Sequence, residues 1–289
     1  MRFYFILAAA LFLILYFLPV SKVALIEKKI EPGQKSPEIE ARAAAAQDLI
    51  SGEVLFSKNS DEILPLASLT KILSGLVVLD YVDLENEIEI TKFAISAPEP
   101  SSLKVGEHLK ARDLLAMAMA ESSNDAITAL FEYASQKNEI VSDGAEAWFL
   151  DLMRKKAESL GARSMNFNNV TGYDVSQTIS GGYGSAEDLL KIAKATLTSP
   201  LWQFGNMSKV ISREGIRHIL KPTNKLGPEL TPLLGSKTGY TDLAGGNLLV
   251  IVEYPIGRPL GIVVLGSSEK GRFEDVRKIL EWIKSKKPL

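Results

Sequence analysis

The 289-residue sequence contains no cysteine and only two histidines, His108 and His218. The lack of cysteine excludes disulfides, thiolate nucleophiles, iron–sulfur clusters and cysteine-ligated zinc. Two histidines argue against a multi-histidine metal site, and both lie in polar stretches that are typical of the protein surface. We therefore expect no metal or other cofactor, and any hydrolytic chemistry should proceed without imidazole.

An excess of either charge is also missing, because 33 Lys and Arg residues stand against 35 Asp and Glu residues. This balance argues against a strongly basic nucleic-acid-binding protein. With 46% hydrophobic and 24% charged residues, the composition excludes a disordered or collagen-like chain. The sequence has no internal repeat, and a chain of this length can bury a substantial core without disulfides.

One long hydrophobic run lies at the N-terminus. Residues 3–20 contain a single residue outside the apolar set, Pro19, and are just long enough to cross a thin bilayer. A removable signal peptide needs a small-x-small cleavage pattern, but Lys22 stands where a small residue is required. We therefore expect residues 1–26 to be a membrane anchor, with a cleaved signal segment as the alternative, and residues 27–39 to be a linker.

Residues 40–289 are expected to form one domain of the α+β class. Hydrophobic periodicity predicts strands near both chain ends, at residues 41–49, 53–57, 233–241, 247–254 and 260–267. It predicts helices at residues 68–84, 112–121, 124–137, 144–160 and 273–286, and a further helix capped by Ser185. The order of these elements favours one antiparallel sheet assembled from both chain ends, together with a mostly helical lobe.

Three short motifs carry candidate chemistry. Ser-x-x-Lys and Ser-x-Asn are weak signals, because each occurs three times, at Ser68, Ser101 and Ser267 and at Ser57, Ser122 and Ser164. Lys-Thr-Gly occurs once, at Lys237, where about 0.1 matches are expected by chance. Each motif also has a structural explanation: a helix cap, a capped helix junction and a solvated strand lysine, respectively.

Position in the chain distinguishes one copy of each motif. Ser68 opens a predicted buried helix, and the i, i+3 spacing places Lys71 on the same face, so that the hydroxyl can lose its proton to the amine. Ser122 and Asn124 lie at a break between two helices, where polar side chains can project into a cleft. Gly239 leaves room for a ligand backbone to approach the predicted strand.

In this order, the three motifs form the set that penicillin-binding proteins and class A β-lactamases share. The chain resembles the low-molecular-mass penicillin-binding D-alanyl-D-alanine carboxypeptidases of serine peptidase family S11 over residues 39–282. The segments that carry the resemblance are residues 66–73, 122–126, 167–174, 185–190 and 236–248. The N-terminal anchor would replace the C-terminal amphipathic helix that anchors other members.

The resemblance implies a role for each matching residue. Ser68 would be the acylated nucleophile and Lys71 the base, and the backbone N–H groups of Ser68 and Tyr240 would form the oxyanion hole. Ser122 and Asn124 would relay protons and orient the substrate amide, and Lys237 would supply positive potential. Thr238 and Arg272 would recognise the substrate carboxylate next to Gly239.

The implied function is removal of the terminal D-alanine from peptidoglycan stem peptides, outside the cytoplasm at the cell membrane. β-Lactams would be covalent inhibitors, and nucleic acid would not be a partner. A DD-endopeptidase would share every motif and stays open as the alternative. A class A β-lactamase would need a Glu-x-x-Leu-Asn segment, which is absent between Asn124 and Lys237. An inactive peptidoglycan-binding homologue would not need intact motifs, so the presence of Ser68, Lys71 and Lys237 argues against it.

Overall fold

The computed structural model describes residues 35–286 except 97, 100, 141 and 231. The predicted membrane anchor, residues 1–26, and most of the predicted linker lie outside the described residues. Within the described part of the chain, no helix is both long and apolar enough to cross a membrane. The sheets and helices belong to the unit Pro37–Leu289.

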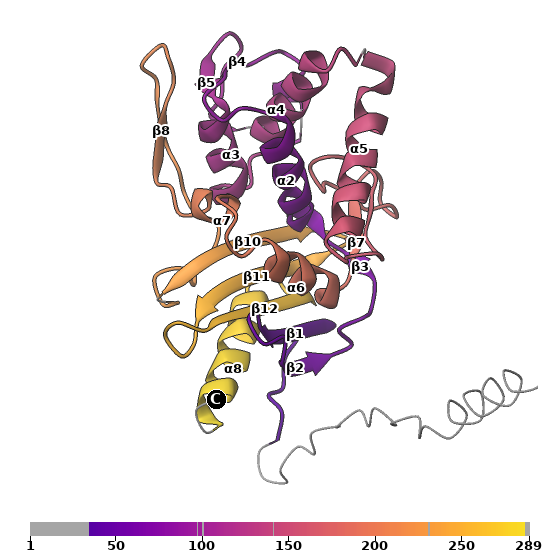
Figure 1. Ribbon diagram of the computed structural model, residues 1–289, viewed down its shortest axis with the longest axis vertical. Coiled ribbons are helices and arrows are strands. Elements are labelled where there is room, and N and C mark those ends of the chain that lie inside the picture. Colours follow the sequence, from indigo (N-terminus) through magenta and orange to yellow (C-terminus); the bar gives the residue numbers. More distant parts are fainter. Residues whose placement is uncertain (1–34, 97, 100, 141, 231, 287–289) are drawn as a thin grey trace, which may run out of the picture. The chain divides into compact units, whose positions relative to one another are not determined.

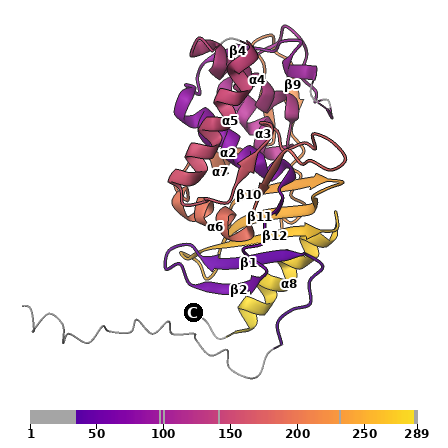
Figure 2. The same ribbon diagram turned by 90° about the vertical axis from the view of Figure 1, so that its right-hand side faces the viewer.

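A five-stranded antiparallel sheet runs through the middle of this unit, in the order β10-β11-β12-β1-β2 (Figures 1 and 2). Its strands are β1 (Ala43–Asp48), β2 (Val54–Lys58), β10 (Leu233–Thr241), β11 (Gly245–Glu253) and β12 (Pro259–Ser267). The sequence predicted all five, with bounds that differ by at most two residues. The predicted α+β class with a sheet from both chain ends is confirmed.

Strand β1 is rich in alanine, although alanine has a low strand propensity. Because side chains alternate along a strand, Ala43 and Ala45 belong to the core under the helical lobe, whereas Ala44 and Ala46 belong to the core under α8. All four are buried. Their small side chains let both faces of the strand be covered closely, which tertiary packing decides and propensity does not.

Helices cover both faces of the sheet. The C-terminal helix α8 (Gly271–Ser285) packs on one face, and the helical lobe lies on the other (Figure 1). The helices on that side are α2 (Lys71–Tyr81), α3 (Ala111–Ala120), α4 (Asn124–Lys137), α5 (Ser142–Ser159), α6 (Ala186–Ala195) and α7 (Leu201–Phe204). The predicted cap of α6 is confirmed, since the Ser185 hydroxyl accepts a hydrogen bond from the Asp188 amide at 3.1 Å.

The predicted helix 68–84 begins differently from the prediction. A 3₁₀ turn, η1 (Ala67–Thr70), precedes α2, so Ser68 lies in the turn and does not cap the α-helix. The helix ends at Tyr81, because Val82 is extended. The first eight residues of α2 are all buried, as an apolar circumference predicts.

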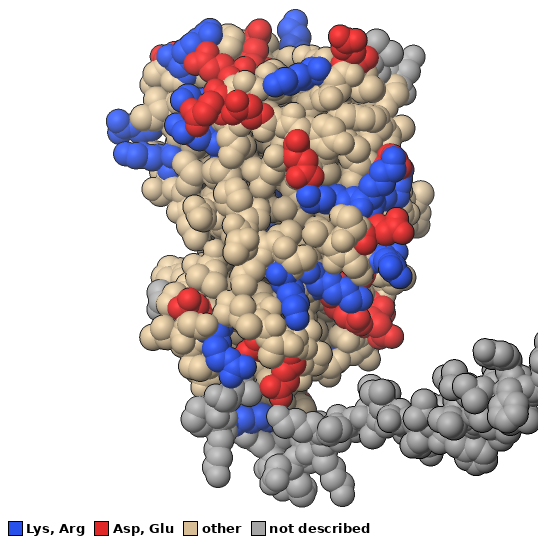
Figure 3. Space-filling model, in the orientation of Figure 1, with Lys and Arg blue, Asp and Glu red and all other residues tan. Residues whose placement is uncertain are grey.

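Seven short strands of the described residues were not predicted from the sequence, because two or three residues show no periodicity. They form one three-stranded and two two-stranded sheets: β3 (Leu64–Pro65), β7 (Gly182–Gly184) and β6 (Asn166–Phe167); β4 (Glu87–Glu89) and β5 (His108–Lys110); and β8 (Lys209–Ile211) and β9 (Arg217–Ile219). Charges of both signs are interspersed among the described residues visible in Figure 3, as the balanced composition predicts.

The prediction that both histidines lie on the surface is wrong for His218. Its side chain is buried, with Nε2 2.6 Å from Glu107 Oε1 and Nδ1 2.7 Å from Ser102 Oγ. Burial is possible because both ring nitrogens have partners. His108 is partly exposed and pairs with Glu214 at 2.9 Å.

Candidate active site

Ser68 and Lys71 meet where η1 leads into α2. Lys71 Nζ lies 2.9 Å from Ser68 Oγ, 2.6 Å from Asn124 Oδ1 and 2.7 Å from the Thr171 carbonyl oxygen. The two carbonyl-type oxygens can only accept hydrogen bonds, whereas the serine hydroxyl can also donate. A charged amine can donate to all three oxygens, whereas a neutral amine can donate to Asn124 and Thr171 and accept from the Ser68 hydroxyl.

The surroundings of Lys71 favour this neutral form. Burial lowers the pKa of the Lys71 amine to about 7, an effect that the Glu99 carboxylate partly opposes. The side chain is completely buried, whereas Ser68 is partly exposed. The base is thus shielded while the hydroxyl beside it stays accessible to a ligand.

Two close backbone approaches hold the turn that carries Ser68. Ala67 has a left-handed backbone with φ of 48°, which is strained for alanine. Gly172 has φ of 81°, and a Cβ atom there would lie 2.0 Å from the Ala67 carbonyl oxygen. Glycine at position 172 therefore allows the neighbouring Thr171 carbonyl to reach Lys71.

Strand β10 is the edge of the sheet next to this turn. A Cβ atom at Gly239 would lie 2.8 Å from the Leu66 carbonyl oxygen and 3.2 Å from the Ser68 nitrogen. Only glycine lets the strand approach so closely. The backbone at Gly239 therefore lies against the Ser68 amide, and the next residue, Tyr240, is exposed.

A second amine–hydroxyl pair joins β10 to the junction between α3 and α4. Lys237 Nζ donates to Ser122 Oγ at 2.8 Å and to the Thr238 carbonyl at 3.0 Å. Burial lowers the pKa of Lys237 well below its usual value, and repulsion from Lys71 and Arg272 lowers it further. Ser122 has a left-handed backbone with φ of 65°, so the helix break predicted at this position is a strained turn.

Thr238 lies in β10, and Arg272 contacts the same strand from α8. Thr238 Oγ1 is 2.6 Å from Thr223 Oγ1, and Thr223 donates its amide to the Ala120 carbonyl at 3.0 Å. Arg272 is buried in the first turn of α8, where Nη1 donates to the Gly239 carbonyl at 2.6 Å and Nε has no partner within the described residues. Arg272 therefore contacts the strand that carries Thr238.

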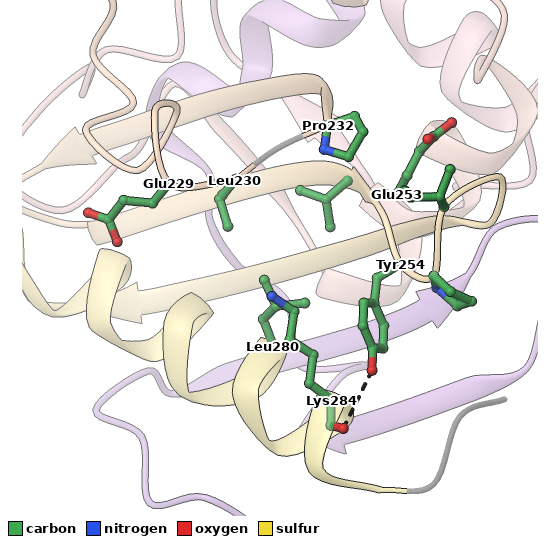
Figure 4. Close-up of a pocket in the computed structure, with 10 residues that line it drawn as sticks. Glu229, Leu230, Pro232, Glu253, Tyr254, Leu280 and Lys284 are labelled. Atoms are coloured by element: carbon green, nitrogen blue, oxygen red, sulfur yellow. Dashed lines mark hydrogen bonds between the residues drawn. The ribbon is translucent and has the colours of Figure 1, made fainter.

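The other Ser-x-x-Lys serines lie elsewhere in different surroundings. Ser101 donates its amide to Asp125 Oδ2 at 2.8 Å, and Ser267 donates its hydroxyl to the buried Asp275 carboxylate at 2.7 Å. A cavity of about 560 Å³ lies between α8, the C-terminal end of β11 and the residues Glu229, Leu230 and Pro232 that precede β10 (Figure 4). None of the predicted site residues lines that cavity, and it adds nothing to the site.

Sequence reasoning missed three residues of this region: Thr171, Thr223 and Glu99. Thr171 acts through a backbone carbonyl, which leaves no side-chain signal, although it lies in the segment 167–174 that carries the family resemblance. Thr223 lies in a loop without periodicity, and Glu99 resembles any exposed glutamate. Only the fold brings them to the motif residues.

Comparison with known proteins identifies the family of this chain. A model of the peptidase S11 family, described as D-alanyl-D-alanine carboxypeptidase, matches residues 30–269. The chain is 30% identical over 263 residues to D-alanyl-D-alanine carboxypeptidase DacF of Bacillus subtilis strain 168, covering 87% of this chain and 64% of that relative. This chain thus spans less than two thirds of the length of DacF.

Two further comparisons bear on activity and fold. The D-alanyl-D-alanine endopeptidase of Escherichia coli K12 is 27% identical over 264 residues, covering 87% of this chain and 79% of that relative. Penicillin-binding protein D2 from Listeria monocytogenes, solved in the ampicillin-bound form, has a TM-score of 0.73 and 25% sequence identity. That likeness covers 87% of this chain and 100% of the Listeria chain, and it confirms the predicted penicillin-binding-protein fold.

Proposed function

Because the chain belongs to the peptidase S11 family of D-alanyl-D-alanine carboxypeptidases, we propose that it removes the terminal D-alanine from peptidoglycan stem peptides through an acyl-enzyme on Ser68. The observation that carries this proposal is the set of Lys71 contacts. Two partners of the amine can only accept hydrogen bonds, and the third is the Ser68 hydroxyl. An amine in these surroundings is suited to take the proton of a serine nucleophile.

In the acylation step, Ser68 Oγ attacks the carbonyl carbon of the penultimate D-alanine while its proton passes to Lys71. The backbone N–H groups of Ser68 and Tyr240 stabilise the resulting oxyanion. When the intermediate collapses, the bond to the terminal D-alanine breaks. The departing amine takes the proton back through the Ser122 hydroxyl, which leaves an ester on Ser68 and a neutral Lys71.

Water hydrolyses this ester in the second step. Lys71, neutral again, accepts a proton from the water as its oxygen attacks the ester carbonyl carbon. Ser68 Oγ leaves and recovers that proton, which restores the free enzyme. Asn124 orients the substrate amide through its side chain, whose oxygen also holds the Lys71 amine in place.

Two buried amines near each other favour a state in which only one is charged, because two ammonium groups repel. The roles proposed here need Lys71 neutral and Lys237 charged. The Lys237 amine donates to the Ser122 hydroxyl and to the Thr238 carbonyl, contacts that it can make in the charged form. A charged Lys237 beside Thr238 then supplies positive potential for the terminal carboxylate of the substrate.

A DD-endopeptidase that cleaves peptidoglycan cross-links is the second candidate. The similarity to the Escherichia coli endopeptidase favours it, since the chain covers more of that relative than of DacF. Such an enzyme would use the same acylation chemistry. The two activities differ in whether a free terminal carboxylate is required.

The proposed function also implies partners and a location. β-Lactams would acylate Ser68 and block the enzyme, in line with the ampicillin-bound structure of the Listeria relative. The substrate is found outside the cytoplasm, so the catalytic domain would lie there as well. Residues 1–26 would hold it at the cell membrane, or be removed if they act as a signal peptide.

Dependence on Arg272 distinguishes the two activities. We expect Arg272→Leu to lower kcat/KM on diacetyl-Lys-D-Ala-D-Ala by about ten- to a hundredfold, the usual effect of losing a charge-assisted hydrogen bond. The same peptide with an amidated terminus should be poor for the wild type and barely change in the variant. The measurement is release of D-alanine, or of its amide, from both peptides.

The control for this experiment is Arg277→Leu, because Arg277 is on the same helix and pairs with Glu229 on the surface. Wild-type enzyme that cleaves both peptides equally well would favour the endopeptidase. An equal loss on both peptides in Arg272→Leu would instead assign Arg272 to holding β10 through the Gly239 carbonyl.

A topology experiment tests the location. Residues from Leu25 onward are expected to lie outside the cytoplasm, so alkaline phosphatase fused to the C-terminus should be active, since its disulfides form only in an oxidising compartment. A silent phosphatase fusion together with an active cytoplasmic reporter at the same junction would contradict the cell-wall function.

A further inference from the structure

The loop between η2 (Ala94–Ser96) and β5 is attached to the N-terminal end of α4 at two points. The Pro98 carbonyl accepts a hydrogen bond from Asn124 Nδ2 at 2.8 Å, and Asp125 Oδ2 accepts one from the Ser101 amide at 2.8 Å. Glu99 lies between these two attachments. The same amide side chain that holds Lys71 through its oxygen thus holds the backbone next to Glu99 through its nitrogen.

Glu99 has a left-handed backbone, with φ of 63°, and an exposed side chain. Residues other than glycine adopt this conformation only where neighbouring contacts impose it, and such strain is often found at functional sites. Further along the loop, the exposed Ser102 is bound to the buried His218, which in turn contacts Glu107. Described residues on both sides of Glu99 are therefore attached to the rest of the domain.

Glu99 is an acidic residue, whereas the other ionisable side chains described at this site are basic. Lys71, Lys237 and Arg272 are all potential cations, and all three are buried. The Glu99 carboxylate is close enough to Lys71 to oppose the effect of burial on that amine. The Glu99 side chain is exposed, and no hydrogen bond joins it to another described residue.

We propose that Glu99 forms a subsite for the ammonium group of the diamino acid that precedes the two D-alanines in a stem peptide. This inference rests on the proposed function, in which Asn124 orients the amide that precedes the scissile bond. The residue on the N-terminal side of that amide then lies beside Pro98 and Glu99. The side chain of the diamino acid ends in a primary amine, which is protonated and positively charged at neutral pH. An exposed carboxylate can bind such a group through a charge-assisted hydrogen bond.

The test compares two peptides that differ only in this charge. Both have an acetylated α-amine and the sequence Lys-D-Ala-D-Ala, and the lysine ε-amine is either free or acetylated. For the wild type we expect kcat/KM to be about fivefold higher for the free amine at low ionic strength, as for an exposed ion pair, with a smaller ratio at high salt. In Glu99→Gln the ratio should fall to about one.

Glu139→Gln is the matched control, because Glu139 is also exposed and left-handed, with φ of 57°. It follows the C-terminal end of the 14-residue helix α4, about 20 Å from Asn124 along the helix axis. This variant should keep the ratio of the wild type.

A wild-type ratio of one, or an unchanged ratio in Glu99→Gln, would overturn the subsite. An equal change on both peptides in Glu99→Gln would also overturn it and would assign Glu99 to control of Lys71 or of the loop. If the wild type cleaves neither peptide, the proposed function itself fails and the subsite fails with it. The absolute rate and the ratio therefore separate the two failures.

Discussion

Replacing Ser68 with alanine is expected to abolish covalent labelling by a fluorescent penicillin. Ser68 combines partial exposure, the amine of Lys71 at 2.9 Å and the close backbone approach of Gly239. Without the hydroxyl no acyl-enzyme forms, so the adduct should disappear and not merely form more slowly. The measurement is the intact mass of the protein from residue 39 onward after incubation with the antibiotic.

The controls for this experiment are Ser101→Ala and Ser267→Ala, which remove the other serines of the Ser-x-x-Lys type. Both variants should still be labelled, because the contacts of these two serines are structural. An adduct that survives in Ser68→Ala but is lost in either control would refute the assignment of the nucleophile.

Replacing Lys71 with arginine is expected to abolish acylation, although the positive charge is kept. The proposed base must be neutral, and a guanidinium group stays protonated at all accessible pH values. Lys237→Arg should be milder, because the proposed role of Lys237 is electrostatic. The comparison is the rate of penicillin labelling in the two variants, measured by quenching the reaction at successive times and determining the intact mass of the protein.

The pH dependence of the wild type gives a second readout of the same proposal. Because burial lowers the pKa of Lys71 to about 7, the amine is mostly protonated below that pH and mostly neutral above it. The acylation rate should therefore rise through about pH 7 and then level off. Equal acylation rates in Lys71→Arg and the wild type, or a flat profile for the wild type, would contradict the base role.

Local patterns in the sequence predicted those parts of the fold that depend on local geometry. The strands of the main sheet follow from apolar runs between glycine and proline, and the cap at Ser185 follows from one residue type before a helix. The Ser68–Lys71 pair follows from i, i+3 spacing, because one helical turn fixes how far apart two side chains lie. The Ser185 cap and the Ser68–Lys71 spacing each involve residues only three positions apart.

The order of the motifs predicted the family resemblance, but not how the motifs meet. Asn124 is 53 residues from Lys71 and Thr171 is 100 residues away, yet both bind its amine. Lys237 reaches Ser122 across 115 residues. No local period encodes contacts over such separations, since they form only when the helical lobe packs against the edge of the sheet.

Burial and charge were likewise decided by tertiary structure. The sequence placed His218 on the surface because its neighbours are polar, but the fold buries it between Glu107 and Ser102. The composition counts Lys71 as one more cation, whereas packing removes water from its amine and lowers its pKa. The sequence by itself determined which residues are available for chemistry, and the tertiary structure decided their protonation and their partners, because desolvation and hydrogen bonding depend on what is packed around each group.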